Sequence, residues 1–183
     1  MVFQLPEELL IAILSQALHI PDDLLNDTSP TSPFINVEFS TSSVLLVCKS
    51  WTRIGTYLLY ETVILRTRPQ ALSLCNTFKQ NPSFSSNVKR LRLEGLCAEV
   101  LGDARVKLAQ LKQLCLALNY TGTREFSGLL EFMRGAEFNL HTIAVADIVG
   151  LNPDQASDFH ILVRETLPSW DHLVRTFVYF MIY

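Results

Sequence analysis

Cys48, Lys49 and Trp51 lie together in the apolar stretch "VLLVCKSWTRI", and these three side chains could carry chemistry. The cysteine could be a nucleophile, a metal ligand or a packing residue, and the tryptophan could pack in a core or anchor a partner. A nucleophilic thiol needs an activating neighbour, and no histidine lies nearby. We therefore expect Cys48 to be a core residue of a helix that begins near residue 44 and has one apolar stripe, formed by Val44, Val47, Cys48 and Trp51.

The other cysteines and the histidines form no recognisable catalytic or metal-binding motif. The four cysteines contain no CxxC pair and have no histidine at metal-ligand spacing, so we expect buried free thiols in a reducing compartment. The four histidines are scattered, and the seven glycines form no phosphate-binding loop. The sequence therefore predicts a protein that is not an enzyme and that binds neither a cofactor nor a metal ion.

Charge and hydropathy exclude two further classes of partner. The formal net charge of -3 argues against non-specific nucleic-acid binding, and the basic cluster "VKRLRLEG" is expected to be the solvent face of a strand. The apolar N-terminus lacks the basic region of a signal peptide, and its apolar run is too short to span a membrane. We expect a protein of the cytosol or nucleus without membrane contact.

Two helices are expected near the N-terminus. Leu5-Pro6 opens the first, and Pro21 ends its apolar run. A polar insertion over about residues 21–43 follows, and a short helical turn is expected within it at "DDLL". Its "TSPTSP" core is expected to be a flexible linker, with phosphorylation as the alternative. Residues 40–43 then offer N-caps for the second helix.

The chain repeats itself after a short strand at "TVILRT" and a helix over about 69–79. Three segments share the pattern apolar-x-x-apolar-x-apolar, spaced by 23 residues from Leu91 to Leu114 and by 29 from Leu114 to Ile143. A weak fourth copy contains Val174, Phe177 and Tyr179. Helical segments between the copies indicate strand-helix units stacked on a parallel sheet, as in leucine-rich repeats. The predicted strand residues that share one core are Leu91, Leu93, Leu114, Leu116, Ile143 and Val145.

The last residues, "FVYFMIY", are almost wholly apolar. A solenoid needs a polar cap on its final repeat, so either something else buries this strand or the chain is a shortened version of a longer protein, and we favour the second.

The N-terminal third resembles the F-box motif. "LPEELLIAILSQAL" followed by "VLLVCKSWTRIGTYLLYETVIL" is similar to the pattern Leu-Pro-x-Glu, an apolar helix, Val-Cys-[Lys/Arg]-x-Trp and a downstream aromatic-Glu-x-Val. Fungal F-box proteins that continue into leucine-rich-like repeats look similar over nearly the whole length. The insertion separates the two helices more widely than is usual in the family, which loop-closure entropy permits.

The resemblance implies a mixed helix and strand fold in two parts. Residues 1–65 would be a small all-helical F-box module with the insertion over about 21–43. Residues 66–183 would be a short, irregular leucine-rich-repeat-like solenoid. The module would dock on the adaptor Skp1 and, through it, on a cullin-RING ubiquitin ligase, while the repeats would bind an unknown target protein. The expected Skp1-binding residues are Leu5, Pro6, Leu9, Ile13, Val47, Cys48, Lys49, Trp51, Leu59 and Tyr60.

A second function stays open: a protein-binding scaffold with the same architecture and no ligase. The short helices carry more apolar surface than they can bury internally, which agrees with a partner interface in either case.

Overall fold

The structure is a computed structural model that describes residues 5–27, 29, 31–35, 41–95, 97–119, 123–135, 140–149, 157, 161, 164–165 and 175–178. The helix predicted over 153–165 and the apolar end after residue 178 lie largely or wholly outside the described residues. Among the helices of the described part, none is long and apolar enough to cross a membrane.

The centre of the fold is a parallel five-stranded sheet with the strands in sequence order. The strands are β1 (Thr62–Leu65), β2 (Arg90–Glu94), β3 (Gln113–Asn119), β4 (Thr142–Val149) and β5 (Arg175–Val178). The β-branched and leucine-rich segments form these strands because such side chains fit a pleated sheet, and consecutive buried residues in β2, β3 and β4 show that both faces are covered.

The register of the sheet confirms the pattern of the first three copies. Leu91 pairs with Leu114, which pairs with Ile143, so the equivalent positions of the sequence pattern lie side by side. The fourth copy is a strand, but its predicted register is wrong by one residue, because Phe177 pairs with Ala144 and not with Ile143. Apolar residues occupy consecutive positions there, at Phe177 and Val178, so alternation alone does not fix the register.

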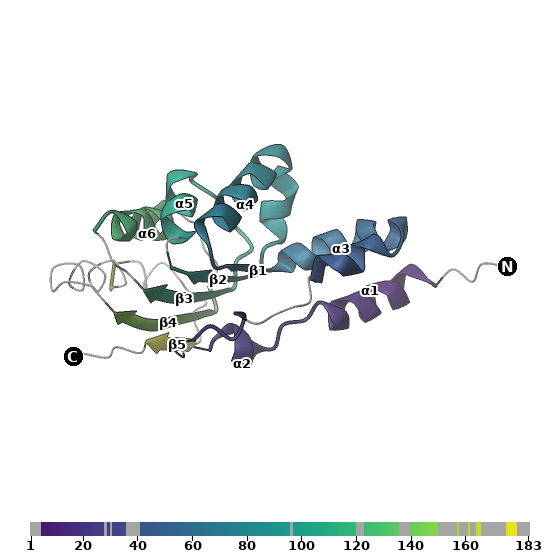
Figure 1. The fold of residues 1–183 in the computed structure, drawn as a ribbon, viewed down its shortest axis with the longest axis horizontal. Coiled ribbons are helices and arrows are strands. Elements are labelled where there is room, and N and C mark those ends of the chain that lie inside the picture. The colour runs from purple at the N-terminus through teal and green to yellow at the C-terminus, as the bar shows by residue number, and fades with distance from the viewer. Residues whose placement is uncertain are drawn as a thin grey trace.

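Three helices lie on one face of the sheet (Figure 1): α4 (Arg68–Gln80), α5 (Cys97–Asp103) and α6 (Thr123–Gly135). Thr67 and Gln70 form a capping box at the start of α4. α5 and α6 approach closely at glycines, since a Cβ on Gly102 would lie 2.3 Å from the backbone oxygen of Gly128. The six predicted strand residues all belong to the main core between this face and the helices.

A pair of helices precedes β1. α1 (Glu7–Ala17) and α3 (Lys49–Glu61) pack side by side around a separate small core of Leu10, Leu14 and Ile54. A 3-10 helix, η1 (Thr41–Leu46), leads into α3, and a second one, η2 (Pro82–Asn87), follows α4. The short helix α2 (Asp22–Leu25) lies on the sheet face opposite α4–α6, and the turn predicted at "DDLL" is therefore confirmed.

The predicted start of the second helix is wrong. The chain forms η1 up to Leu46, then passes through an extended residue at Cys48 (φ -164°, ψ 170°), and α3 begins only at Lys49. Thr52 explains the break, because its hydroxyl donates a hydrogen bond to the carbonyl of Leu45 at 2.6 Å and so satisfies the end of η1. Val47 and Cys48 therefore lie in a bend and do not continue the apolar stripe of α3.

Candidate functional site

The apolar surface of α1 is divided between a packed side and an exposed side. Leu10 and Leu14 are buried against α3. Leu5 and Leu9 are 52% and 53% exposed, and Ile13 is 46% exposed. Three of the predicted Skp1-binding residues thus share the exposed part of this segment. Pro6 is the N-cap residue of α1, with Glu7 and Glu8 following it in the first turn, where negative charge favours the helix dipole.

The bend before α3 adds a second exposed group of predicted residues. Leu46 and Val47 are 85% and 62% exposed, and Cys48 and Lys49 are exposed as well. The prediction of a buried Cys48 is therefore wrong, because the end of η1 removes this residue from the packed stripe. The exposed residues Leu5, Leu9, Ile13, Leu46 and Val47 are together named the docking surface.

Trp51 packs against the small core between α1 and α3. It is half-buried there, and the core consists of Leu10, Leu14 and Ile54. A Trp indole buries a large apolar area at such a site. Trp51 therefore holds α1 and α3 together, in addition to whatever surface it presents to a partner.

An exposed ion pair also connects the two helices. Arg53 on α3 donates to both carboxylate oxygens of Glu7 on α1, at 3.2 and 2.6 Å. This hydrogen bond and the accompanying charge interaction lower the pKa of Glu7 and raise that of Arg53. Because the pair is bidentate, it orients α1 relative to α3 although it is open to solvent.

The last two predicted residues face a different environment. Leu59 and Tyr60 are half-buried, and the Tyr60 ring stacks on Phe84 of η2 with ring centroids 4.7 Å apart. Tyr60 also packs against the main core. The structure therefore brings Tyr60 to the junction between α3 and the sheet.

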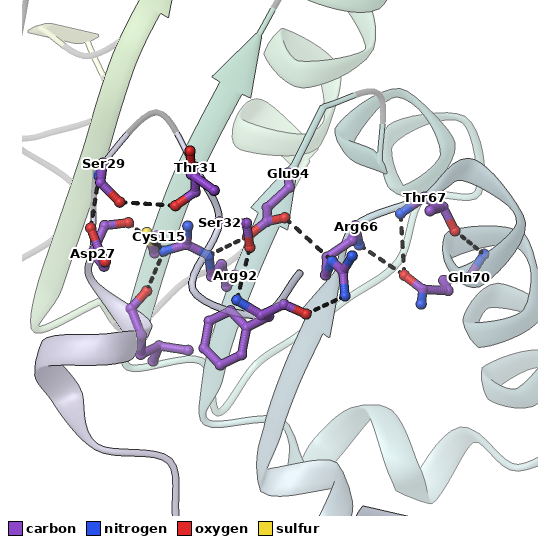
Figure 2. A network of polar contacts seen from close by, with 12 residues as sticks. Asp27, Ser29, Thr31, Ser32, Arg66, Thr67, Gln70, Arg92, Glu94 and Cys115 are labelled. Carbon is purple, nitrogen blue, oxygen red and sulfur yellow. Dashed lines mark hydrogen bonds and ion pairs between the residues drawn. The ribbon is translucent and has the colours of Figure 1, made fainter. Parts of the chain in front are cut away.

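A polar network lies on the sheet face opposite α4–α6, and the sequence did not predict it (Figure 2). Arg92 of β2 is completely buried, with 0% of its surface exposed. Its guanidinium donates to the carbonyls of Leu25 and Asp27 at 2.8 and 2.7 Å and to a Glu94 oxygen at 2.7 Å. The expectation that this basic cluster is a solvent face is therefore wrong, because a segment from the insertion covers the strand.

That segment is here named the covering segment and comprises residues 20–35, of which 28 and 30 are not described. Arg90 donates to the carbonyl of Ile20 at 2.6 Å and forms an ion pair with Asp22 at 2.7 Å. The Gln113 amide of β3 donates to the Asn26 side chain at 3.1 Å. Leu25, within the segment, is completely buried. The prediction of a flexible linker is thus wrong for the described part of the insertion.

The end of the covering segment joins the same network. Ser32 donates its hydroxyl to Glu94 at 2.7 Å, and Arg66 of the chain just after β1 donates to the carbonyl of Phe34. Arg66 also lies 3.7 Å from the second Glu94 oxygen. The guanidinium carbon Cζ of Arg92 lies over the Phe34 ring, 5.5 Å from the ring centroid, in a cation-π geometry.

Three of the four thiols are buried, as predicted. Desolvation raises the pKa of Cys75, and raises that of Cys97 and of Cys115 to about 11. Cys97 belongs to the main core, whereas Cys115 lies on the covered face, where Arg92 contacts its sulfur at 3.4 Å. Thiols with raised pKa values are poor nucleophiles and metal ligands at neutral pH. Within the described residues, no group of three or more His, Cys, Asp or Glu side chains could hold a metal ion.

Comparison with known proteins gives no family for this chain. No protein-family model matches the sequence, and no curated protein and no solved structure shows significant similarity to it.

Proposed function

We propose that this chain is the substrate-recognition subunit of a Skp1-cullin-F-box ubiquitin ligase, with α1 and the bend before α3 as its contact with Skp1. The observation that carries the proposal is the docking surface itself. A helix of eleven residues buries Leu10 and Leu14 and leaves two further large apolar side chains, Leu9 and Ile13, one turn apart on the same side and 53% and 46% exposed. Large apolar groups gathered in this way are typical of a protein-protein interface.

The residue types at the bend support the same assignment. Val47, Cys48 and Lys49 match the Val-Cys-[Lys/Arg] part of the F-box pattern, and all three are exposed. A partner could contact them without unfolding the module. Trp51, the next residue of the pattern, would position this bend by anchoring α3 to α1.

The remaining part of the chain would be the target-binding region, built as an irregular leucine-rich-like array. The parallel strands in sequence order and the aligned leucines of β2 and β3 support this interpretation. On this proposal the chain has no chemistry of its own, because the partner ligase and the conjugating enzyme transfer ubiquitin.

Co-purification of the protein with Skp1 tests the proposal. Ile13→Asp places a charge in the docking surface, and we expect at least a tenfold loss of Skp1 binding, or about 1.4 kcal/mol or more. Leu72→Asp is the matched control, because Leu72 on α4 is also 46% exposed but lies away from the docking surface. It should bind Skp1 as the wild type does.

Trp51 is a poorer choice for this test, since truncating it would also remove packing between α1 and α3. Circular dichroism and a urea unfolding curve on both aspartate variants confirm that they fold. If the folded wild-type protein does not bind Skp1, the ligase proposal is wrong and a scaffold without a ligase takes its place.

A further inference from the structure

The covering segment contains both Ser-Pro dipeptides of the sequence, Ser29-Pro30 and Ser32-Pro33. Ser29 is exposed, and its backbone N–H donates to the Asp27 carboxylate at 2.7 Å. Ser32 is half-buried, and its hydroxyl is the hydrogen-bond donor that connects the segment to Glu94 of β2. The same oxygen of Ser32 accepts from the Phe34 N–H at 3.2 Å, which fixes the turn at this point.

The charges around Ser32 are balanced in the present state. Two cations, Arg66 and Arg92, face two carboxylates, Glu94 and Asp27. Only 13% of the Glu94 side chain and 1% of the Arg92 side chain are exposed. Because Glu94 and Arg92 have little access to water, an added charge beside them is tolerated poorly.

We propose that Ser32 is a phosphorylation site for a proline-directed protein kinase and that its phosphate releases the covering segment from the sheet. In this step the Ser32 oxygen attacks the γ-phosphorus of ATP and forms the phosphate ester. The bond from the γ-phosphorus to the bridging oxygen breaks, ADP leaves, and the hydroxyl proton is lost.

The direction of the effect follows from the Ser32 contact. A phosphoserine has no hydroxyl proton to donate, so the hydrogen bond to Glu94 disappears. It also adds a charge of roughly -2 beside that carboxylate, which turns the balanced cluster into one with a net charge of roughly -2. Because Ser32 is half-buried in the closed state, the kinase acts on molecules whose covering segment has opened locally, and the phosphate prevents closure.

Release would expose the strand face that carries Arg90, Arg92 and Cys115. If the proposed function holds, phosphorylation would thereby open this face to a target protein, and that consequence rests on the ligase proposal. The release itself does not depend on it.

Cys115 and Cys97 form an internal pair of reporters for the test. Both are completely buried and both have a pKa raised to about 11, but Cys115 lies on the covered face and Cys97 in the main core. The protein carrying Ser29→Ala and Cys48→Ser is phosphorylated in vitro by a proline-directed protein kinase with ATP. Alkylation of Cys115 and of Cys97 by iodoacetamide is then followed by mass spectrometry. A synthetic peptide of residues 26–36 shows whether the kinase phosphorylates Ser32 before Pro33 when the segment is not folded on the sheet.

We expect phosphate on Ser32 and a rise of about tenfold or more in the alkylation rate of Cys115 relative to Cys97. Thr31→Glu is the control for added charge, since it places a carboxylate on the exposed neighbour of Ser32, and it should leave the rate ratio unchanged. The absence of phosphate on Ser32, in the peptide or in the protein, overturns the proposal. So does a phosphorylated protein in which the Cys115 to Cys97 ratio stays constant or falls.

Discussion

Arg92 shows how far a single residue can depart from its expected environment. In the sequence it alternates with leucines and looks like the solvent side of an amphipathic strand. In the structure it is completely buried, and its guanidinium donates to two backbone carbonyls of the covering segment and to the carboxylate of Glu94 on the same strand. A buried charge of this kind is tolerated because a carboxylate and hydrogen bonds to backbone carbonyls compensate for its lost hydration.

Replacing Arg92 should therefore be costly. Arg92→Met leaves the carbonyls of Leu25 and Asp27 without this donor in a buried setting, so we expect the free energy of unfolding to fall by about 3–5 kcal/mol. Urea denaturation followed by circular dichroism measures the change. Lys89→Met is the control, because the Lys89–Glu61 pair is exposed and is worth about 1 kcal/mol or less. If Arg92→Met and Lys89→Met lower the free energy of unfolding equally, the buried network around Arg92 does not stabilise the fold as described.

Cys48 was expected to be buried and is exposed, whereas Arg92 was expected to be exposed and is buried. The apolar neighbours of Cys48 predict a core position, yet the residue is exposed, because a local hydrogen bond from Thr52 ends η1 just before it. A side-chain cap of this kind competes with helix continuation, and helical periodicity does not detect it.

At the scale of elements, the break between η1 and α3 is what exposes the bend. Thr52→Val keeps the shape of the side chain and removes the hydroxyl that serves Leu45 and Cys48. We expect a loss of about 1 kcal/mol in the free energy of unfolding. Thr56→Val is the matched control, since that hydroxyl bonds only the Thr52 carbonyl one turn earlier in the helix and should cost close to nothing. Urea unfolding of both variants measures these changes. If Thr56→Val lowers the free energy of unfolding as much as Thr52→Val does, the explanation of the break is wrong.

The strands were predictable from the sequence because their signal is local. Leu91, Leu114 and Ile143 repeat the same short pattern, and the register places them side by side. The covering segment was not predictable, because its contacts with the sheet and with the chain just after β1 join residues 32 to 87 positions apart. Its polar composition is typical of a loop, and its place on the sheet depends on the buried Leu25 and on polar contacts with distant residues such as Arg90 and Arg92.

At the scale of the whole molecule, the two proposed activities occupy different regions. The docking surface lies on α1 and the bend before α3, while the strands and α4–α6 form the other part of the fold (Figure 1). Tyr60 and Phe84 connect these parts through their stacked rings. The covering segment runs from the end of α1 across β2 and β3, so it also links the docking helices to the sheet. A partner on α1 would therefore leave α4–α6 free for other contacts.

Hydrogen exchange of the protein alone and with saturating Skp1 tests the central claim most directly. The account predicts slower amide exchange over residues 5–17 and 46–51 in the complex. It predicts unchanged exchange over α4, α5 and α6. The opposite pattern, with protection on α4–α6 and none on α1, would contradict the assignment of the docking surface. No protection anywhere, with both proteins folded, would contradict the proposal that this chain binds Skp1.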